Sequence, residues 1–217
     1  MPGTSHKIFG VGLQRTGTTS LDRALQILGY RAIHGPYELI HGLDSELLNQ
    51  YDAFTDNPVP LLYQELDRAY PGSKFILTVR PLEDWLGSVE WLFTQGYSTY
   101  QREKFPEIHQ IHEAIYGRKM FDREVFAETW RRHREEVQNY FQDRPGDLLV
   151  LDLHENFNWE TLCPFLETEI PNQRIPHRHK GTTVLGWSSR LKNMLFKAIS
   201  KIVPIGRWLS SRRSSTK

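Results

Sequence analysis

The 217-residue chain lacks several features that would define its class at once. It has one cysteine, Cys163, so no intrachain disulfide can form, and its apolar neighbours predict a buried structural thiol. No Cys/His spacing typical of zinc is present, and His109, His112 and His133 are expected on a helical surface. No run reaches the ~18 apolar residues of a membrane-spanning helix, and residues 1–7 lack the apolar region of a signal peptide. The expectation is a cytoplasmic globular protein.

The chain as a whole carries almost no net charge, but its charged residues are unevenly distributed along the sequence. The formal net charge is +1, yet residues 187–217 hold eight Lys or Arg and no Asp or Glu, which leaves −7 on residues 1–186. Apolar residues between Arg190 and Val203 recur at helical spacing, with lysines beside the apolar face. This pattern predicts an amphipathic helix that either lies in a membrane interface or packs on the acidic domain.

The most informative segment is the glycine-bearing turn at residues 12–20. It follows a short apolar run and leads into a segment whose leucines recur at helical spacing, so the order is strand, turn, helix. Gly12 and Gly17 let the backbone wrap around an anion, the helix N-terminus points free N–H groups into the turn, and Arg15 adds a fixed charge. The spacing is that of a P-loop in which Thr18 replaces the lysine. This loss argues against ATP or GTP hydrolysis but leaves phosphate or phosphosulfate binding as the prediction; the alternative is a glycine turn without a ligand.

A second candidate anion site follows a later apolar run. Residues 75–79 fit a buried strand between Pro71-Gly72 and Pro81; the run ends at Arg80, and Ser88 follows on the next predicted helix. Ligands of open α/β sheets bind at the carboxyl ends of strands, and an arginine with a hydroxyl suits a dianionic phosphate. The alternative for the arginine alone is a surface ion pair.

These two patterns carry a resemblance to a known family. The run from Arg15 to Thr19 matches the 5′-phosphosulfate loop, [KR]-[ST]-G-T-[TS], of sulfotransferases that use 3′-phosphoadenosine 5′-phosphosulfate (PAPS); Arg80 and Ser88 match that family's 3′-phosphate motif. Over roughly residues 6–183 the chain resembles the short P-loop sulfotransferase branch. Further matches are the helix 24–30, His34, the segment Asp56-Asn57-Pro58, the strand 148–152, the tryptophan helix 159–166 and the close near Ile175-Pro176. The chain departs from the pattern at Asn158 and at residues 177–180. These departures affect the expected C-terminal lid and not the residues expected to bind the cofactor.

The resemblance implies an α/β fold, with a mostly parallel sheet flanked by helices, and the alternation of short apolar runs with helical patterns agrees. We expect residues 1–186 to form the sulfotransferase-like P-loop domain, with a helical lid at about 97–145, and residues 187–217 to form the basic C-terminal tail. Most lid aromatics fit a helical core; Tyr97 and Tyr100 are the pocket candidates. Strands are expected near 7–12, 31–34, 52–56, 74–79 and 148–152. Helices are expected near 18–29, 59–70, 82–95, 107–117, 122–143, 159–167 and 189–202.

The same resemblance implies roles for individual residues. Arg15 would stabilise the leaving phosphate oxygen electrostatically, because an arginine does not give up a proton at neutral pH. Arg80 and Ser88 would hold the 3′-phosphate. A short basic element at 178–181 resembles a clamp on the same phosphate, with a solvated basic loop as the alternative. The predicted cofactor-binding residues are Gln14, Arg15, Thr16, Gly17, Thr18, Thr19, Ser20, Arg80, Ser88, Arg178, Lys180 and Gly181.

The acceptor group needs a general base. The resemblance makes Asp56 the first choice, because cytosolic sulfotransferases carry a histidine at the matching place, about two dozen residues before the 3′-phosphate arginine. Partial desolvation would raise the pKa of its carboxyl group and suit it to a base; its alternative role is to cap the following turn. His34, after the second predicted strand, is the other candidate base. Asp152 ends an apolar strand as a Walker B aspartate would, but a structural turn is the preferred interpretation, and no metal site is predicted.

The sequence therefore predicts an enzyme that moves a sulfuryl group from PAPS to a hydroxyl or amine and releases 3′,5′-bisphosphoadenosine (PAP). The acceptor would be a small molecule, a carbohydrate or a lipid, and no nucleic-acid partner is expected. One alternative is a P-loop small-molecule kinase, against which Thr18 argues. Another is a non-catalytic bisphosphonucleotide-binding module held at a membrane. The expected location is cytoplasmic, either free or peripheral at a membrane surface through the C-terminal helix.

Overall fold

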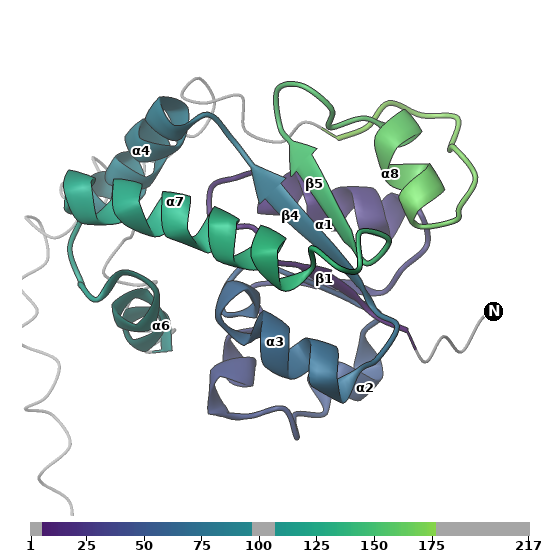
Figure 1. Cartoon of the computed structure of the whole chain (residues 1–217), viewed down its shortest axis with the longest axis horizontal. Coiled ribbons are helices and arrows are strands. Elements are labelled where there is room, and N and C mark those ends of the chain that lie inside the picture. Colours follow the sequence, from purple (N-terminus) through teal and green to yellow (C-terminus); the bar gives the residue numbers. More distant parts are fainter. Residues whose placement is uncertain (1–5, 97–106, 177–217) are drawn as a thin grey trace, which may run out of the picture. The chain divides into compact units, whose positions relative to one another are not determined.

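A computed structural model describes residues 6–96 and 107–176 of the chain. Its sheet has five parallel strands in the order β2-β3-β1-β4-β5 (Figure 1). The strands are β1 (Ile8–Gly10), β2 (Ala32–His34), β3 (Ala53–Thr55), β4 (Lys74–Val79) and β5 (Leu148–Asp152). Each strand predicted from the sequence is confirmed, and so is the parallel α/β architecture.

Helices separate the strands along the chain. They are α1 (Thr18–Ile27), α3 (Val59–Ala69), α4 (Leu82–Trp91) with a π-helical extension η2 (Leu92–Gly96), α6 (Glu107–Tyr116), α7 (Arg123–Tyr140) and α8 (Trp159–Phe165). Two short helices, η1 (Tyr37–His41) and α2 (Leu47–Gln50), were not predicted, because one helical turn shows no periodicity. The predicted helix at 189–202 and the candidates Tyr97 and Tyr100 lie outside the described residues. None of the described helices is both long and apolar enough to cross a membrane.

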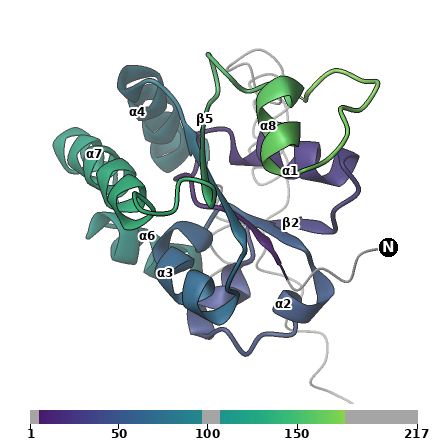
Figure 2. The same cartoon turned by 45° about the vertical axis from the view of Figure 1, so that its right-hand side comes forward.

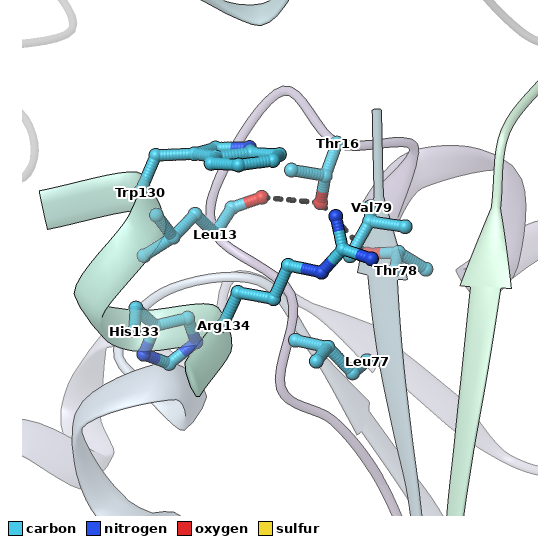
Figure 3. A pocket seen from close by; sticks show the side chains of 8 residues that line it. All are labelled: Leu13, Thr16, Leu77, Thr78, Val79, Trp130, His133 and Arg134. Atoms are coloured by element: carbon cyan, nitrogen blue, oxygen red, sulfur yellow. Dashed lines mark hydrogen bonds between the residues drawn. The ribbon is translucent and has the colours of Figure 1, made fainter. Parts of the chain in front are cut away.

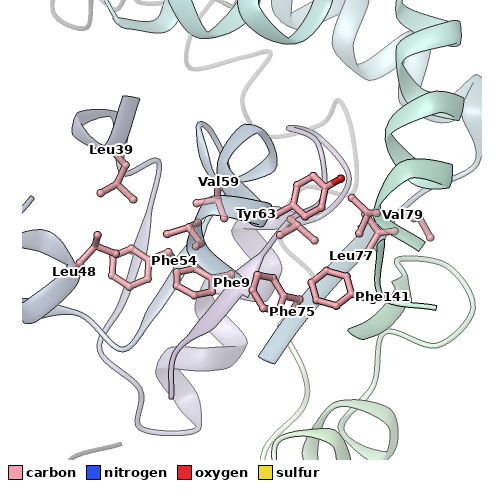
Figure 4. Packing of buried hydrophobic residues seen from close by; sticks show 13 residues of the cluster. Phe9, Leu39, Leu48, Phe54, Val59, Tyr63, Phe75, Leu77, Val79 and Phe141 are labelled. Carbon is pink, nitrogen blue, oxygen red and sulfur yellow. The ribbon is translucent and has the colours of Figure 1, made fainter. Parts of the chain in front are cut away.

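Helices cover both faces of the sheet (Figures 1 and 2). On one face α3 and α7 pack against an aromatic core that includes Phe9, Phe54 and Phe75 of the strands (Figure 4). Phe141, directly after α7, lies with its ring centroid 4.7 Å from that of Phe75. The second half of α7 is therefore part of the sheet's core, since Val137 is also buried there.

The other face packs against α1 and α8. Leu21 and Leu25 of α1 are fully buried, as their spacing predicts, and so is Cys163 of α8. A third apolar cluster joins α4, α6 and α7; in it the rings of Tyr116 and Phe126 stack with centroids 3.9 Å apart. These two aromatics belong to a helical core, as predicted.

The strand order reverses at the carboxyl ends of β1 and β4. From β1 the chain builds β2 and β3 on one side of the sheet, then crosses to β4 on the other side. Ligands of open parallel sheets bind where the strand order reverses in this way. β1 leads directly into the glycine-bearing turn, and β4 leads directly to Arg80, so both predicted anion motifs lie at this point.

Candidate functional site

The turn after β1, residues 11–17, is the glycine loop. Glycine is required at positions 12 and 17 for two different structural reasons. A Cβ atom on Gly12 would lie 2.0 Å from Oγ1 of Thr78, so only glycine lets the loop pass this close to β4. Gly17 has a φ of 109°, in the left-handed region that favours glycine. The sequence therefore makes the loop follow one tight path between β1 and α1.

Several buried groups hold the backbone of the glycine loop. Oγ1 of Thr16 donates to the carbonyl oxygen of Leu13 at 2.6 Å and lies 2.7 Å from Oγ1 of Thr78. Nε1 of Trp85, in α4, donates to the carbonyl oxygen of Gln14 at 2.9 Å. The side chain of Thr16, a predicted cofactor residue, is thus occupied within the protein, and its backbone N–H also bonds Leu13.

Two histidines predicted to lie on a helical surface are instead part of this support. His112 of α6 is 3% exposed, and its Nε2 lies 3.1 Å from Oε1 of Gln14. Nε2 of His133, in α7, lies 2.7 Å from the carbonyl oxygen of Val11. Burial lowers the pKa of the His133 imidazole. The surface prediction was wrong because His112 shares the helix face of the buried isoleucines of α6: Ile108, Ile111 and Ile115.

A small cavity lies behind the glycine loop (Figure 3). Its volume of about 10 Å³ is room for roughly one water molecule. The loop, β4 and α7 line it, through Leu13, Thr16, residues 77–79, Trp130, His133 and Arg134. A nucleotide or an acceptor does not fit this space, so the cavity belongs to the packing of the loop.

The N-terminus of α1 is arranged to receive an anion. Gly17 is the N-cap residue, so no side chain caps the helix, and the first turn carries no acidic residue. Thr18 and Ser20 are buried, whereas Thr19 is half-buried with its Oγ1 3.3 Å from Nε2 of His34. Uncapped backbone N–H groups together with the positive end of the helix dipole favour a phosphate-like group here.

The glycine loop and the second motif meet at Arg15. Nε of Arg15 donates to Oγ of Ser88 at 2.9 Å, although the two residues are 73 positions apart. The guanidinium also lies 5.9 Å from the ring centroid of Trp91, a cation–π distance. The two segments predicted separately to bind anions therefore meet at this point.

Arg80 provides the clearest open donor of the site. It follows β4 directly, and its Nε is buried with no hydrogen-bond partner among the described residues. A buried donor without a partner costs free energy, about 1–3 kcal/mol for a neutral group and more for a charged one. An anionic ligand at the end of β4 would satisfy it. The other predicted phosphate contacts, Arg178, Lys180 and Gly181, lie outside the described residues.

Asp56 and His34 form an ion pair at the ends of β3 and β2. Oδ2 of Asp56 lies 3.1 Å from Nε2 of His34, and Nδ1 of His34 lies 3.1 Å from Oγ1 of Thr55. The Asp56 side chain is only 15% exposed, and its Oδ1 is buried without a hydrogen-bond partner in the described part of the chain. Since α3 begins after Pro58 without a side-chain cap, the carboxylate does not cap that helix.

The ion pair between Asp56 and His34 shifts the pKa of both side chains. Burial is the largest influence on the pKa of Asp56 and would raise it, but the His34 imidazolium, the backbone N–H of Asn57 and the charge of Arg15 together lower it below its ordinary value. Burial is the largest influence on the pKa of the His34 imidazole and would lower it, but the Asp56 carboxylate and the charge of Asp22 together raise it. The predicted rise in the pKa of Asp56 was therefore wrong, because the sequence does not show that a cation binds the carboxylate directly.

We expect this pair to stabilise the fold in a defined pH window. The Asp56 contribution is present above the unfolded pKa of about 3.9 and is lost as pH falls through its lowered folded pKa; the His34 contribution is present below about 6.5 and is lost as pH rises through its raised folded pKa. The stability difference between wild type and His34→Gln should be largest between about pH 4 and 6.5 and should shrink toward pH 9. Urea unfolding across this range measures it, with the exposed His41→Gln as control. A difference that stays constant from pH 5 to 9 would contradict the ion pair.

Asp152 takes a structural role. Its Oδ1 accepts a hydrogen bond from the backbone N–H of His154 at 2.8 Å, and its own N–H donates to Oδ1 of Asn156 at 2.6 Å. These bonds form the turn after β5, as the structural interpretation predicted. Among the residues that the structure describes, no group of three His, Cys, Asp or Glu could hold a metal ion.

The parallel sheet, the glycine loop and the two arginines at the strand-order reversal define an α/β protein of the P-loop type. The sulfotransferase domain family matches residues 7–45 and 41–184 of the chain. The chain therefore belongs to the sulfotransferase family, as the sequence resemblance predicted. It is similar to "Ava biosynthesis cluster protein M" of Aspergillus versicolor, with 28% identity in an alignment that covers 79% of this chain and 80% of that protein.

Proposed function

We propose that this protein transfers a sulfuryl group from PAPS to a hydroxyl or amine acceptor and releases PAP, without a metal ion. The observation that carries the proposal is the meeting of Arg15 and Ser88 beside the uncapped N-terminus of α1, with a buried open donor on Arg80. One end of this site suits a phosphosulfate and the other a second phosphate. That separation of anion contacts is what distinguishes PAPS from a simple mononucleotide.

Different residues would bind the two anionic groups of PAPS. Backbone N–H groups of the glycine loop and of the first turn of α1, with Thr18 and Thr19, would hold the 5′-phosphosulfate. Arg80 and Ser88 would hold the 3′-phosphate. Ser88 can do so while accepting from Arg15, because a hydroxyl accepts and donates at once. Gln14 would contribute through the loop backbone, since its side chain bonds within the protein. Thr16 would contribute by fixing the shape of the loop, because its side chain and its backbone N–H both bond within it.

PAPS supplies an activated sulfuryl group whose bond to the 5′-phosphate breaks as a bond from sulfur to the acceptor forms. Negative charge grows on the departing phosphate oxygen, and the Arg15 guanidinium stabilises that charge. The acceptor proton passes to Oδ1 of Asp56, the carboxylate oxygen that is buried and free of protein partners in the described region, and from there to solvent. His34 holds Asp56 through Oδ2. Both ring nitrogens of His34 have near neighbours, which favours Asp56 over His34 as the base.

The acceptor itself is proposed at the level of class: a small molecule, a carbohydrate or a lipid. The name of the Aspergillus relative, a biosynthesis cluster protein, supports a small molecule. The reaction is proposed to take place in the cytoplasm. The basic segment 187–217 would either pack on the acidic domain or hold the enzyme at a membrane surface.

Nucleotide selectivity tests the proposed function. We expect PAP to bind with micromolar affinity and 5′-AMP to bind roughly ten- to a hundredfold more weakly, because a charge-assisted contact to the 3′-phosphate contributes about 1.5–3 kcal/mol. Isothermal calorimetry measures both affinities, and ATP with and without magnesium tests the kinase alternative.

Two variants make the nucleotide experiment specific to the end of β4. Arg80→Gln should remove most of the preference for PAP, whereas Arg68→Gln, on the exposed side of α3, should keep it. Equal affinity of the wild type for PAP and 5′-AMP would overturn the proposal. Tight binding of ATP only with magnesium would favour a kinase.

A further inference from the structure

Two residues of the proposed site share an unusual backbone conformation. Arg15 and Asp56 both have a φ of 70°, and among the described non-glycine residues only Glu167 also has a positive φ. Such a conformation costs an ordinary residue of the order of 1–3 kcal/mol and persists only where the surroundings impose it. Something must therefore hold the residue proposed to stabilise the leaving group and the residue proposed as base.

The neighbours of these two residues are bonded to each other. Nδ2 of Asn57 donates to Oε1 of Gln14 at 2.8 Å, and both side chains are buried. Gln14 directly precedes Arg15, and Asn57 directly follows Asp56. One side-chain hydrogen bond thus joins the two strained segments, which come from the loops after β1 and β3.

His112 completes this arrangement from a distant part of the chain. Its Nε2 lies 3.1 Å from the same Gln14 oxygen, although the residues are 98 positions apart. Because Oε1 of Gln14 can only accept, His112 donates from Nε2. The ring packs against Phe93, with centroids 4.6 Å apart. Hydrogen bonds in such an apolar environment are strong, and losing one is costly.

We propose that Gln14, Asn57 and His112 form a buried clasp that holds Arg15 and Asp56 in their left-handed conformations, and that His112 is a positioning residue for catalysis. This inference rests on the proposed function, because it assigns His112 to the placement of groups proposed to act on PAPS and acceptor. His112 lies on α6, within the segment predicted to cover the acceptor. The clasp therefore couples that segment to the loop that holds the donor.

The clasp has a defined consequence for kinetics. Ground-state binding of the donor uses several loop N–H groups and Arg80, which do not depend on one conformation of Arg15. Stabilisation of the leaving oxygen does depend on it, and small misplacements of such a group reduce rate far more than binding. Loss of the His112 donor should therefore lower kcat and leave PAP affinity nearly unchanged.

Two substitutions at His112 test the clasp. His112→Phe keeps an aromatic ring but cannot donate, whereas His112→Gln places an amide N–H near the position of Nε2 and can still donate to Gln14. The control is Tyr140→Phe, which removes a hydrogen bond to Asp67 far along α7. Hydrogen exchange of peptides spanning 12–17 and 54–59 reports the clasp without any turnover. Release of PAP from PAPS with water as acceptor reports kcat, and calorimetry reports PAP affinity.

We expect His112→Phe to speed exchange in both peptides and to lower kcat about tenfold, with PAP affinity within about threefold of wild type. His112→Gln should restore most of kcat, and Tyr140→Phe should change only the unfolding temperature. If exchange and kcat in His112→Phe stay at wild-type values, or if His112→Gln rescues neither, the clasp is refuted. A wild-type protein that neither binds PAP nor releases it from PAPS would refute the proposed function instead, while the exchange experiment would still decide whether the clasp exists.

Discussion

Arg15→Ala is expected to lower kcat by about a hundred- to a thousandfold, while PAP affinity changes by less than about tenfold. The guanidinium is fixed by its bond to Ser88 and by its place over Trp91, so its charge is aimed before the reaction begins. An electrostatic group that acts on charge developing in the transition state affects turnover more than binding. The other contacts to the donor remain in the variant.

The experiment compares kcat at saturating PAPS with PAP affinity from calorimetry. Arg15→Lys retains the charge but not the fork of donors, and should fall between wild type and alanine. Arg23→Ala, on the exposed side of α1, serves as the matched control and should behave as wild type. A variant Arg15→Ala that loses PAP affinity but keeps its kcat would make Arg15 a binding residue only.

Asp56→Asn is expected to lower kcat by about a hundred- to ten-thousandfold and to leave PAP affinity unchanged, because general base catalysis commonly contributes that much. Asparagine has nearly the same shape but cannot take a proton from the acceptor. Since His34 lowers the pKa of Asp56, the wild-type rate should not fall with acidification until the pH is below the ordinary aspartate value of about 3.9. A pH–rate profile for both proteins checks this expectation.

Asp143→Asn removes an exposed carboxylate near the C-terminal end of α7 and is the control for the change of net charge. Full activity in Asp56→Asn would move the base to His34 or remove it from the mechanism. His34→Gln separates these outcomes: if it is inactive while Asp56→Asn is active, His34 is the base.

The strands and longer helices could be predicted because their patterns are local. The apolar run that becomes β4 and the leucine spacing of α1 each specify an element and its buried face. The glycine loop was also readable, since Gly12 and Gly17 are required by close approach and by a positive φ. The helices η1 and α2 were missed because they are one turn long and depend on tertiary packing.

The site was predictable as a set of segments, but its internal contacts were not. The bonds from Arg15 to Ser88 and from Gln14 to His112 join positions 73 and 98 residues apart, and no local pattern reports such pairs. The same limit explains the wrong sign for the pKa of Asp56: its partner comes from another strand end. His112 could have been found from its place on the isoleucine face of α6, which marks a buried polar group that needs a partner.

The most direct test of the central claim follows the sulfuryl group itself. The protein is incubated with PAPS that is radiolabelled in the sulfuryl group, together with panels of phenols, alcohols, amines, sugars and lipids, and both PAP and labelled acceptor are quantified. We expect at least one acceptor to gain label in equal amount to the PAP formed, without added metal, and Arg15→Ala to abolish most of this transfer. Transfer of the γ-phosphoryl group of ATP to an acceptor of the panel, with no transfer of label from PAPS, would contradict the proposed function.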